Sequence, residues 1–322
     1  MECATLGAAF PAGRVQADYS TAFPKLEQPF LDRCHAMAII AARQAIEDAG
    51  FAGFERHGSR AGLHYGNVNG GVATIHQWHE DMLLGGKRKA RPFTAMAIMS
   101  NGGAAQVAIR HAIQGPVLTH ASACASSAIA IGEAMRAIAE GRLDVAVAGG
   151  AEAPLEAPLF GVFDGTRALS PIDGADPAAS CKPFSSRRSG LVLGEGAAFL
   201  VLEAEDHARA RGAVIHGYLV GYGVACDAHH IGMPASEGQV RCLRAALEDA
   251  GLGPAQVDYV NAHATATDGG DAIEAASLRE VFGTGPDAPA VSSTKSVHGH
   301  LLGAAGALEC LVSVLATREG LL

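Results

Sequence analysis

An eight-residue stretch occurs twice in this chain, and the repetition limits what the chain can fold into. Residues 43–50 read RQAIEDAG and residues 244–251 read RAALEDAG, so six of the eight positions are identical. Each copy ends an Ala-rich amphipathic segment at glycine, the residue that often follows the last turn of a helix. A strand-like apolar run comes after each copy, at 61–65 and at 257–261. The repeated helix-then-strand order predicts two related α/β halves.

The length of the chain supports this division. With 322 residues it exceeds the roughly 100–200 residues of a typical single domain. We predict an N-terminal half over 1–205 and a C-terminal half over 206–322. The stretch 154–183 contains five prolines and is predicted to be an irregular excursion that lines a site or a subunit interface. Short apolar runs predict further strands at 117–120, 144–148, 197–203, 215–224 and 290–293, and periodic segments predict helices at about 125–140 and 302–318.

Composition and charge exclude several classes of function. Acidic residues outnumber basic residues by 33 to 24, and the resulting net charge of −9 disfavours nucleic acid and anionic lipid as partners. The seven cysteines are scattered without a Cys-x-x-Cys pair, which fits neither a disulfide scaffold nor a zinc module. We find no secretory signal and no apolar run of the roughly 18 residues that span a membrane, so we expect a soluble cytoplasmic protein.

One cysteine has the surroundings of a nucleophile. Cys124 lies in the segment HASACASS, residues 120–127, where a predicted strand ends and a predicted helix begins among small residues. The unpaired N–H groups and the positive end of the helix dipole favour a thiolate there, and the small neighbours leave room for a substrate carbonyl. A cysteine considered alone is more often a small buried hydrophobe, and this interpretation applies to the other six.

Two histidines could handle the protons that a thiol nucleophile requires. His263 lies in NAHATAT at 261–267, and His300 ends the segment SSTKSVHGH at 292–300. Each follows a predicted strand, and open α/β sheets bind ligands at the carboxyl ends of their strands. Each histidine taken singly is more often structural than catalytic, so the assignment depends on their occurring together with Cys124.

The combined motifs resemble the elongating β-ketoacyl-acyl carrier protein synthases of the thiolase superfamily, which act in type II fatty acid and polyketide synthesis. The resemblance rests on SACASS at 122–127, NAHATAT at 261–267, and SSTKS at 292–296 followed by GHLLGAAG at 299–306. Further matches at 148–152, 182–184 and 194–197 extend it over nearly the whole chain. It implies a thiolase-like α/β fold, in which two duplicated halves form a five-layer α-β-α-β-α arrangement.

The resemblance also implies a reaction and a role for each catalytic residue. Cys124 would accept the acyl group by transthioesterification, and His263 and His300 would stabilise the enolate formed when malonyl thioester loses CO₂. Lys295 would support the His300 network electrostatically. The implied product is a β-ketoacyl thioester in fatty acid, polyketide or polyene synthesis, and no catalytic metal or cofactor is implied beyond the 4′-phosphopantetheine that carries the substrates.

Further residues match positions of the family that bind or surround the substrate. The threonines of the NAHATAT motif, Thr265 and Thr267, would bind the pantetheine arm. Asn69 and Thr94 would wall the acyl pocket, and Asn261 and Glu309 would shape a polar site behind the histidines.

A basic run in this acidic chain has two interpretations. Residues 87–91 read KRKAR, and a solvated loop explains such a run as well as a binding site does. The resemblance favours the second, because Arg88 and Lys89 match positions at which related synthases contact their acidic acyl carrier protein. Acyl carrier protein and the acyl and malonyl thioesters are therefore the expected partners, together with a second subunit in a homodimer or a ketosynthase heterodimer.

The chain also departs from the pattern of the family. Ala264 and Asp268 replace a glycine and a proline after the first histidine, and Ser185 replaces an aspartate. The first strand of the family, its last two strands and its Gly-Phe-Gly-Gly loop have no match, so we expect a chain truncated at both ends. In the family this loop donates an N–H to the oxyanion hole. We expect its absence to reduce activity, since one oxyanion donor typically contributes about 10²–10³ in rate. A non-catalytic partner such as a chain-length factor is the alternative, although that class usually lacks the nucleophile. A Cys-His hydrolase would explain Cys124 but neither Lys295 nor the repeat.

Overall fold

A four-stranded sheet forms the centre of the N-terminal half in the computed structural model, which describes residues 1–3, 6–19 and 21–321. Its central strand β4 is parallel to both neighbours, whereas the outer strand β8 is antiparallel to β6. Every residue of β4 and β6 is buried, as expected for strands that are covered on both faces. The strand order is β5 (Val117–His120), β4 (Ala61–Gly66), β6 (Val145–Glu152) and β8 (Gly196–Glu203).

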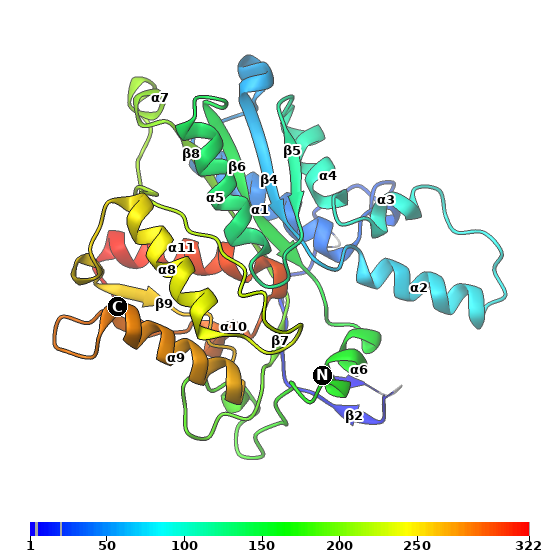
Figure 1. The fold of residues 1–322 in the computed structure, drawn as a ribbon. Coiled ribbons are helices and arrows are strands. Elements are labelled where there is room, and N and C mark those ends of the chain that lie inside the picture. Colours follow the sequence, from blue (N-terminus) through cyan, green and yellow to red (C-terminus); the bar gives the residue numbers. More distant parts are fainter. Residues whose placement is uncertain (4–5, 20, 322) are drawn as a thin grey trace.

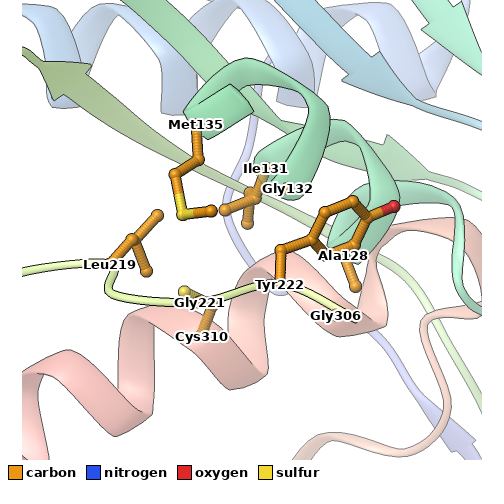
Figure 2. Close-up of a pocket in the computed structure, with 9 residues that line it drawn as sticks. All are labelled: Ala128, Ile131, Gly132, Met135, Leu219, Gly221, Tyr222, Gly306 and Cys310. Carbon is orange, nitrogen blue, oxygen red and sulfur yellow. The ribbon is translucent and has the colours of Figure 1, made fainter. Parts of the chain in front are cut away.

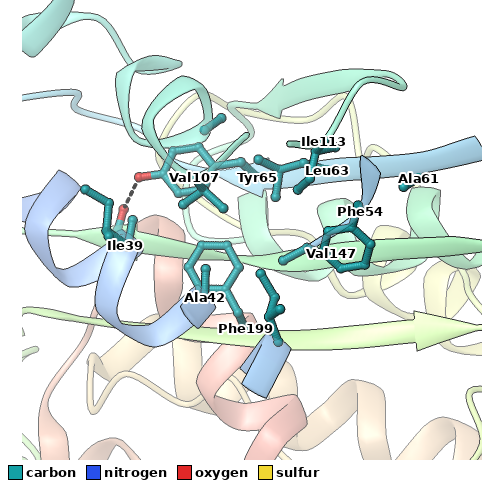
Figure 3. Packing of buried hydrophobic residues seen from close by; sticks show 14 of the residues in the cluster. Ile39, Ala42, Phe54, Ala61, Leu63, Tyr65, Val107, Ile113, Val147 and Phe199 are labelled. Atoms are coloured by element: carbon teal, nitrogen blue, oxygen red, sulfur yellow. Dashed lines mark hydrogen bonds between the residues drawn. The ribbon is translucent and has the colours of Figure 1, made fainter. Parts of the chain in front are cut away.

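Helices cover both faces of this sheet (Figure 1). Alternate residues of β6 point to opposite faces: Val145 and Val147 pack with α1 and α4, while Ala146 and Ala148 pack with α5 and α11. Figure 3 shows the first of these cores, where Tyr65 packs among apolar side chains. The four helices are α1 (Arg33–Asp48), α4 (Gly102–His111), α5 (Ser126–Ala139) and α11 (Ala305–Glu319).

The C-terminal half adds two more layers. Strands β9 (Tyr259–Asn261) and β10 (Ala290–Ser292) pair in parallel, and α11 contacts β9 as well as β8. Helices α8 (Ser236–Ala250) and α9 (Asp268–Phe282) pack on each other and cover the outside of this half (Figure 1). The order of layers is therefore α1 and α4, the large sheet, α5 and α11, the small sheet, and α8 and α9. This arrangement confirms the predicted five-layer α/β fold.

The two copies of the repeated stretch have the same local structure. The first copy includes the end of α1 and the second the end of α8, and the last residue of each is a glycine with positive φ, Gly50 at 77° and Gly251 at 66°. A short 3-10 helix then leads into a strand in both halves, η3 (Glu55–Arg60) before β4 and η5 (Pro254–Gln256) before β9. The repeat thus marks equivalent helix-to-strand units.

The predicted strand at 215–224 is wrong. The segment is irregular in the described chain and lies between α8 and the central helices α5 and α11. A Cβ at Gly223 would be 2.2 Å from the carbonyl oxygen of Cys242, so the segment packs directly on α8. Leu219 and Tyr222 line a cavity of about 140 Å³ against α5 and α11 (Figure 2). Its apolar residues are thus used in packing, but no neighbouring strand pairs with it among the described residues.

The remaining elements are short and lie around the two sheets. Helix α6 interrupts the stretch 154–183, which was predicted to be irregular throughout. No described helix is long and apolar enough to cross a membrane. These elements are β1 (Glu2–Cys3), β2 (Ala8–Ala9), β3 (Ala12–Gly13), β7 (Leu193–Gly194), α2 (Val72–Leu83), α3 (Thr94–Ile98), α6 (Ala157–Gly165), α7 (Glu205–Ala210), α10 (Lys295–His298), η2 (Gln28–Phe30), η4 (Pro177–Ser180) and η6 (Leu302–Ala304).

Candidate active site

Cys124 lies in a tight turn between β5 and α5. Ala123, directly before it, has φ of 47°, a left-handed conformation that is strained for a residue with a Cβ. The hydroxyl of Ser126 holds the turn, because it accepts from the backbone N–H of Ser122 at 2.9 Å and donates to the carbonyl of Ala123 at 2.6 Å. The thiol is thereby fixed just before the first turn of α5, at the carboxyl end of the large sheet.

Three glycines let other elements approach the first turn of α5 closely. A Cβ on Gly66 of β4 would lie 2.4 Å from the backbone of Ser127, and one on Gly150 of β6 would lie 2.8 Å from the Ser127 Cβ. On the opposite side, a Cβ on Gly306 of α11 would lie 2.8 Å from the Cβ of Ala128. The sequence needs glycine at these positions because any side chain there would displace the helix that follows the nucleophile.

The first histidine follows strand β9, and hydrogen bonds from its backbone hold it in place. The N–H groups of His263 and Ala264 donate to the two carboxylate oxygens of Glu274, at 2.7 and 2.6 Å. Glu274 comes from α9, so this helix fixes the turn that presents the imidazole. Solvent reaches the His263 ring, which places it at the opening of the site.

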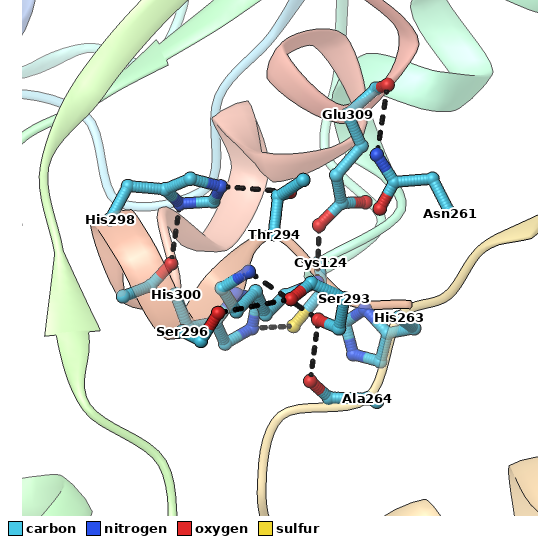
Figure 4. A network of polar contacts seen from close by, with 12 residues as sticks. Cys124, Asn261, His263, Ala264, Ser293, Thr294, Ser296, His298, His300 and Glu309 are labelled. Atoms are coloured by element: carbon cyan, nitrogen blue, oxygen red, sulfur yellow. Dashed lines mark hydrogen bonds and ion pairs between the residues drawn. The ribbon is translucent and has the colours of Figure 1, made fainter. Parts of the chain in front are cut away.

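The second histidine completes a compact group with the thiol. The backbone of His300 bonds to strand β7 and its neighbour, with its N–H donating to Val192 at 2.7 Å and its carbonyl accepting from Gly194 at 2.9 Å. Its Nε2 lies 2.9 Å from the Sγ of Cys124 (Figure 4). The rings of His263 and His300 are nearly perpendicular, with centroids 5.2 Å apart. The structure therefore brings together the three residues that the sequence motifs indicate as nucleophile and histidine pair.

Burial determines the protonation of this group. Desolvation raises the pKa of the Cys124 thiol to about 11, and the positive charge of Lys295 only partly opposes it. Desolvation is also the largest cause that lowers the pKa of the buried His300, and His263 and Lys295 lower it further. The protein packed around His263 and the charge of Lys295 lower the pKa of this ring as well, although one side of it is open to solvent. The amino end of α5 favours a thiolate, but burial outweighs it, so near neutral pH the site holds a protonated thiol and two neutral imidazoles.

Lys295 and Glu309 form a buried ion pair behind the histidines. The Lys295 side chain is completely inaccessible to solvent, and its Nζ contacts a Glu309 carboxylate oxygen. Asn261 donates from Nδ2 to the backbone carbonyl of Glu309 at 3.3 Å, while its Oδ1 is buried without a partner. The predicted polar cluster therefore exists, and the ion pair compensates most of the lysine charge at the site.

The two threonines of the NAHATAT motif lie together on the turn after His263. The hydroxyls of Thr265 and Thr267 are 3.1 Å apart. Between them, Ala266 has φ of 68°, and its N–H donates to the buried carboxylate of Asp271, which also accepts from the N–H of Phe184 at 2.7 Å. Asp271 thus joins the threonine turn to the KPF segment, and both threonines face the same region.

Arg188 provides a second link between these segments. Its guanidinium donates to the backbone carbonyls of Ser185 at 3.1 Å, Thr267 at 3.2 Å and Asp268 at 2.8 Å. Ser185 and Asp268 are both positions at which the sequence departs from the family pattern. Arg188 bonds to their backbone carbonyls, so these two departures leave its contacts to the turn intact.

A fully buried carboxylate supports the wall of the site. Glu152, at the end of β6, accepts hydrogen bonds from the backbone N–H groups of Val68, Asn69 and Gly303 at 3.0 to 3.2 Å and from the side chains of Asn67 and Asn69 at 3.3 Å. It connects the loop after β4 to the turn that follows His300. The side chain of Asn69, predicted to wall the acyl pocket, is therefore held by Glu152.

Three other predicted residues lie in the segment between α2 and α3 or at the start of α3. Thr94 begins α3, and its hydroxyl donates to the carbonyl of Arg91 at 2.8 Å, a contact within its own turn rather than with Cys124. Arg88 and Lys89 are exposed in the segment between α2 and α3, which projects from the body of the molecule (Figure 1). The structure thus leaves the Thr94 hydroxyl bonded within its own turn and the basic pair exposed to solvent, and the predicted roles of these residues stay predictions.

Sequence reasoning missed the residues that hold the site in place. Glu152, Glu274, Asp271 and Arg188 act on backbone groups of distant turns, and a sequence does not show such contacts. One signal was present for two of them: Asp271 and Glu274 are three residues apart on α9, directly after the NAHATAT motif, and such spacing places both on one helix face.

Comparisons with known proteins agree with the fold and the motifs. Residues 12–208 match the N-terminal domain of beta-ketoacyl synthase, and residues 216–322 match its C-terminal domain. The chain is 41% identical to nodulation protein E of Rhizobium leguminosarum bv. trifolii, over 93% of this chain and 73% of that protein. It is 39% identical to 3-oxoacyl-[acyl-carrier-protein] synthase 2 of Staphylococcus aureus, over 92% of this chain and 73% of that protein.

A solved structure shows the same architecture. The crystal structure of a beta-ketoacyl synthase from Burkholderia phymatum STM815 superposes with a TM-score of 0.88 and 35% identity, over 98% of this chain and 77% of that one. The similarity therefore extends over both halves of the fold. The chain belongs to the beta-ketoacyl synthase family of condensing acyltransferases.

Proposed function

We propose that this condensing enzyme loads an acyl chain on Cys124 and extends it by a two-carbon unit from malonyl thioester, with His263 and His300 as the decarboxylating pair. The observation that carries the proposal is the approach of His300 Nε2 to Cys124 Sγ at 2.9 Å, beside the ring of His263. A non-catalytic partner subunit would not need this thiol between two imidazoles, so the geometry favours the catalytic role.

Acyl loading requires a thiolate at the moment of attack. The Nδ1 of His300 is buried without a hydrogen-bond partner. A buried acceptor without a partner costs less free energy than a buried N–H without one, so we assign the ring proton to Nε2. This N–H donates to the sulfur and stabilises the thiolate, together with the nearby Lys295 and the amino end of α5. The Cys124 sulfur forms a bond to the thioester carbonyl carbon, and the bond from that carbon to the pantetheine sulfur breaks. The pantetheine thiolate takes up the proton released by Cys124.

The same imidazoles then serve the malonyl group. Cleavage of the carboxylate C–C bond releases CO₂ and moves the electron pair into an enolate, whose oxygen accepts hydrogen bonds from His263 and His300. A neutral imidazole keeps one N–H and can donate it to the enolate oxygen. The lowered pKa of both rings, which keeps them neutral, is therefore compatible with this role. The enolate carbon attacks the acyl carbonyl, and the Cys124 sulfur leaves as the β-ketoacyl thioester forms.

The substrates would reach the site on the pantetheine arm of an acyl carrier protein. The paired hydroxyls of Thr265 and Thr267, next to His263, can hydrogen-bond the amides of this arm. Arg88 and Lys89 offer exposed positive charge to an acidic carrier in a chain that is otherwise negative. A similar ketosynthase structure, with a TM-score of 0.81 and 31% identity, is described in complex with its type II polyketide acyl-carrier protein. We propose no further cofactor.

We also propose that the chain works with a second subunit, either another copy or a ketosynthase-like partner. Strand β5 is at the edge of the described sheet and pairs with β4 alone, and its Val117 and Leu118 are exposed. Such an edge is a site for pairing with another chain. A related structure with 33% identity and a TM-score of 0.84 is described as a ketosynthase/chain length factor. Sedimentation of the purified chain, alone and with a candidate partner, distinguishes the two assemblies.

Two variants test the proposed division of roles. Cys124→Gln should abolish acyl transfer and retain CO₂ release from malonyl carrier protein, because the amide fills the space of an acylated cysteine and leaves the histidines in place. His300→Ala should remove most CO₂ release and retain some acylation of Cys124. CO₂ release and the mass of the acyl-enzyme are measured for both, with the surface variant His216→Ala as a control. CO₂ release by His300→Ala at the parent rate would contradict the mechanism.

A further inference from the structure

The donor atoms of the catalytic group have the spacing of a metal site. One ligand atom each from Cys124, His263 and His300 lies within 4.8 Å of the other two, and among the described residues this is the only such group. Zinc binds sulfur at about 2.3 Å and imidazole nitrogen at about 2.0–2.1 Å in tetrahedral geometry, so its donors are roughly 3.5 Å apart. The 2.9 Å between His300 Nε2 and Cys124 Sγ and the 4.8 Å upper limit for the group lie on either side of that spacing.

The chemistry of these donors selects a borderline-soft divalent ion. Thiolate and imidazole are the preferred ligands of Zn²⁺, whereas Mg²⁺ and Ca²⁺ prefer oxygen. The nearby cation Lys295 is paired with Glu309, so its repulsion of an incoming ion is largely compensated. Solvent reaches the His263 ring, which provides an entry path, and three protein ligands leave the fourth position open for water.

We propose that Zn²⁺ binds reversibly to Cys124, His263 and His300 and inhibits the enzyme by occupying the sulfur of the nucleophile. Binding releases the thiol proton to solvent, because a coordinating thiol is deprotonated. The His300 ring proton moves from Nε2 to Nδ1, so that Nε2 can ligate. No electron is transferred, and removal of the ion restores the free thiol.

The surroundings predict a moderate affinity. Zinc-ligating histidines in dedicated sites donate their second N–H to a carboxylate or a carbonyl, and loss of such a partner typically costs about 10–100-fold in metal affinity. The Nδ1 of His300 is buried without a hydrogen-bond partner. The site should therefore bind zinc more weakly than a structural zinc site does, and a chelator should remove the ion readily.

Cobalt spectroscopy tests the ligand set directly. Co²⁺ added to the full chain should give a near-ultraviolet thiolate-to-cobalt charge-transfer band and the intense visible bands of tetrahedral cobalt. Both should be lost in Cys124→Ser and weakened in His263→Ala, and both should persist in Cys242→Ser, whose thiol donates to the Gly223 carbonyl and is outside the catalytic group. Bands of equal intensity in Cys124→Ser and the parent chain would overturn the assignment, as would the absence of a charge-transfer band.

Zinc protection tests the inhibitory consequence. Zn²⁺ should slow carbamidomethylation of Cys124 by at least tenfold, and excess EDTA should restore the original rate. In His263→Ala, which keeps the thiol, at least tenfold more Zn²⁺ should be needed for the same protection. Unchanged alkylation at saturating Zn²⁺, or equal protection in His263→Ala, would refute the proposal. Both measurements use the thiol without substrate, so their outcome is independent of the proposed condensation.

Discussion

The buried carboxylate of Glu152 should make the stability of the protein depend on pH in a way that one substitution removes. Burial raises its pKa to about 7 from 4.5, and its five hydrogen-bond donors, all uncharged, oppose the rise only in part. The folded state therefore binds this proton more tightly than the unfolded state. Its stabilising contribution is complete below the unfolded pKa and is lost as pH rises through the folded pKa.

The magnitude follows from the size of the shift. Each pKa unit corresponds to about 1.4 kcal/mol, so the full effect of Glu152 on the free energy of unfolding is about 3 kcal/mol. Between pH 5.5 and pH 8 linkage predicts a loss of about 2 kcal/mol. Glu152→Gln carries no charge at either pH. Its amide N–H₂ faces N–H donors, which costs about 1–3 kcal/mol by itself, but this cost does not change with pH.

The assay is reversible urea unfolding of the parent chain and Glu152→Gln at both pH values. The difference in unfolding free energy should shift by about 2 kcal/mol in favour of the variant from pH 5.5 to pH 8. Glu205→Gln is the control: hydrogen bonds from Arg209 and Tyr218 lower the pKa of Glu205, and neither of these partners is a histidine. That control should show no shift in this range. An equal difference at both pH values for Glu152→Gln would refute the reasoning.

Three further predictions follow from the charged and thiol groups of the site. The rate at which iodoacetamide labels Cys124 should rise steeply from pH 7 to pH 9, because burial raises its pKa to about 11 and only the thiolate reacts; peptide mapping that finds the same rate at both pH values would contradict this. Arg88→Glu with Lys89→Glu should weaken carrier-protein binding about tenfold at low salt and leave Cys124 alkylation unchanged, as titration at two salt concentrations would show; unaltered affinity would make the basic run a solvated loop. Glu309→Ala should lower the free energy of unfolding by about 3–5 kcal/mol, because it leaves the inaccessible Lys295 charge unpaired, and the double variant with Lys295→Met should recover much of this loss in urea unfolding.

The sequence predicted the catalytic group because short motifs contain it. Cys124 follows β5 of the large sheet, whereas His263 and His300 come after β9 and β10 of the small sheet. Their meeting was therefore implied by the resemblance of the combined motifs and not by the order of strands. The protonation state of the thiol could not be predicted in the same way. A helix start is visible in the sequence, whereas the burial that raises the pKa of Cys124 depends on elements from both halves.

The wrong strand at 215–224 has a physical cause. An apolar run shows that a segment will be buried but not whether another strand will pair with it, and 215–224 packs against helices instead. The outcome depends on neighbours that are distant in the sequence.

The close approach of Gly66, Gly150 and Gly306 to the first turn of α5 has a consequence for interpreting natural variation in this protein. These glycines come from three separate elements, and none of them belongs to the group of Cys124, His263 and His300. A survey of alleles that ranks positions by sequence distance from the nucleophile would regard Gly306 as remote and tolerant. The structure instead makes the three positions depend on one another, because an alanine at any of them adds one methyl group against the same helical turn. The loss of stability from two such alleles together should therefore be less than the sum of their separate losses.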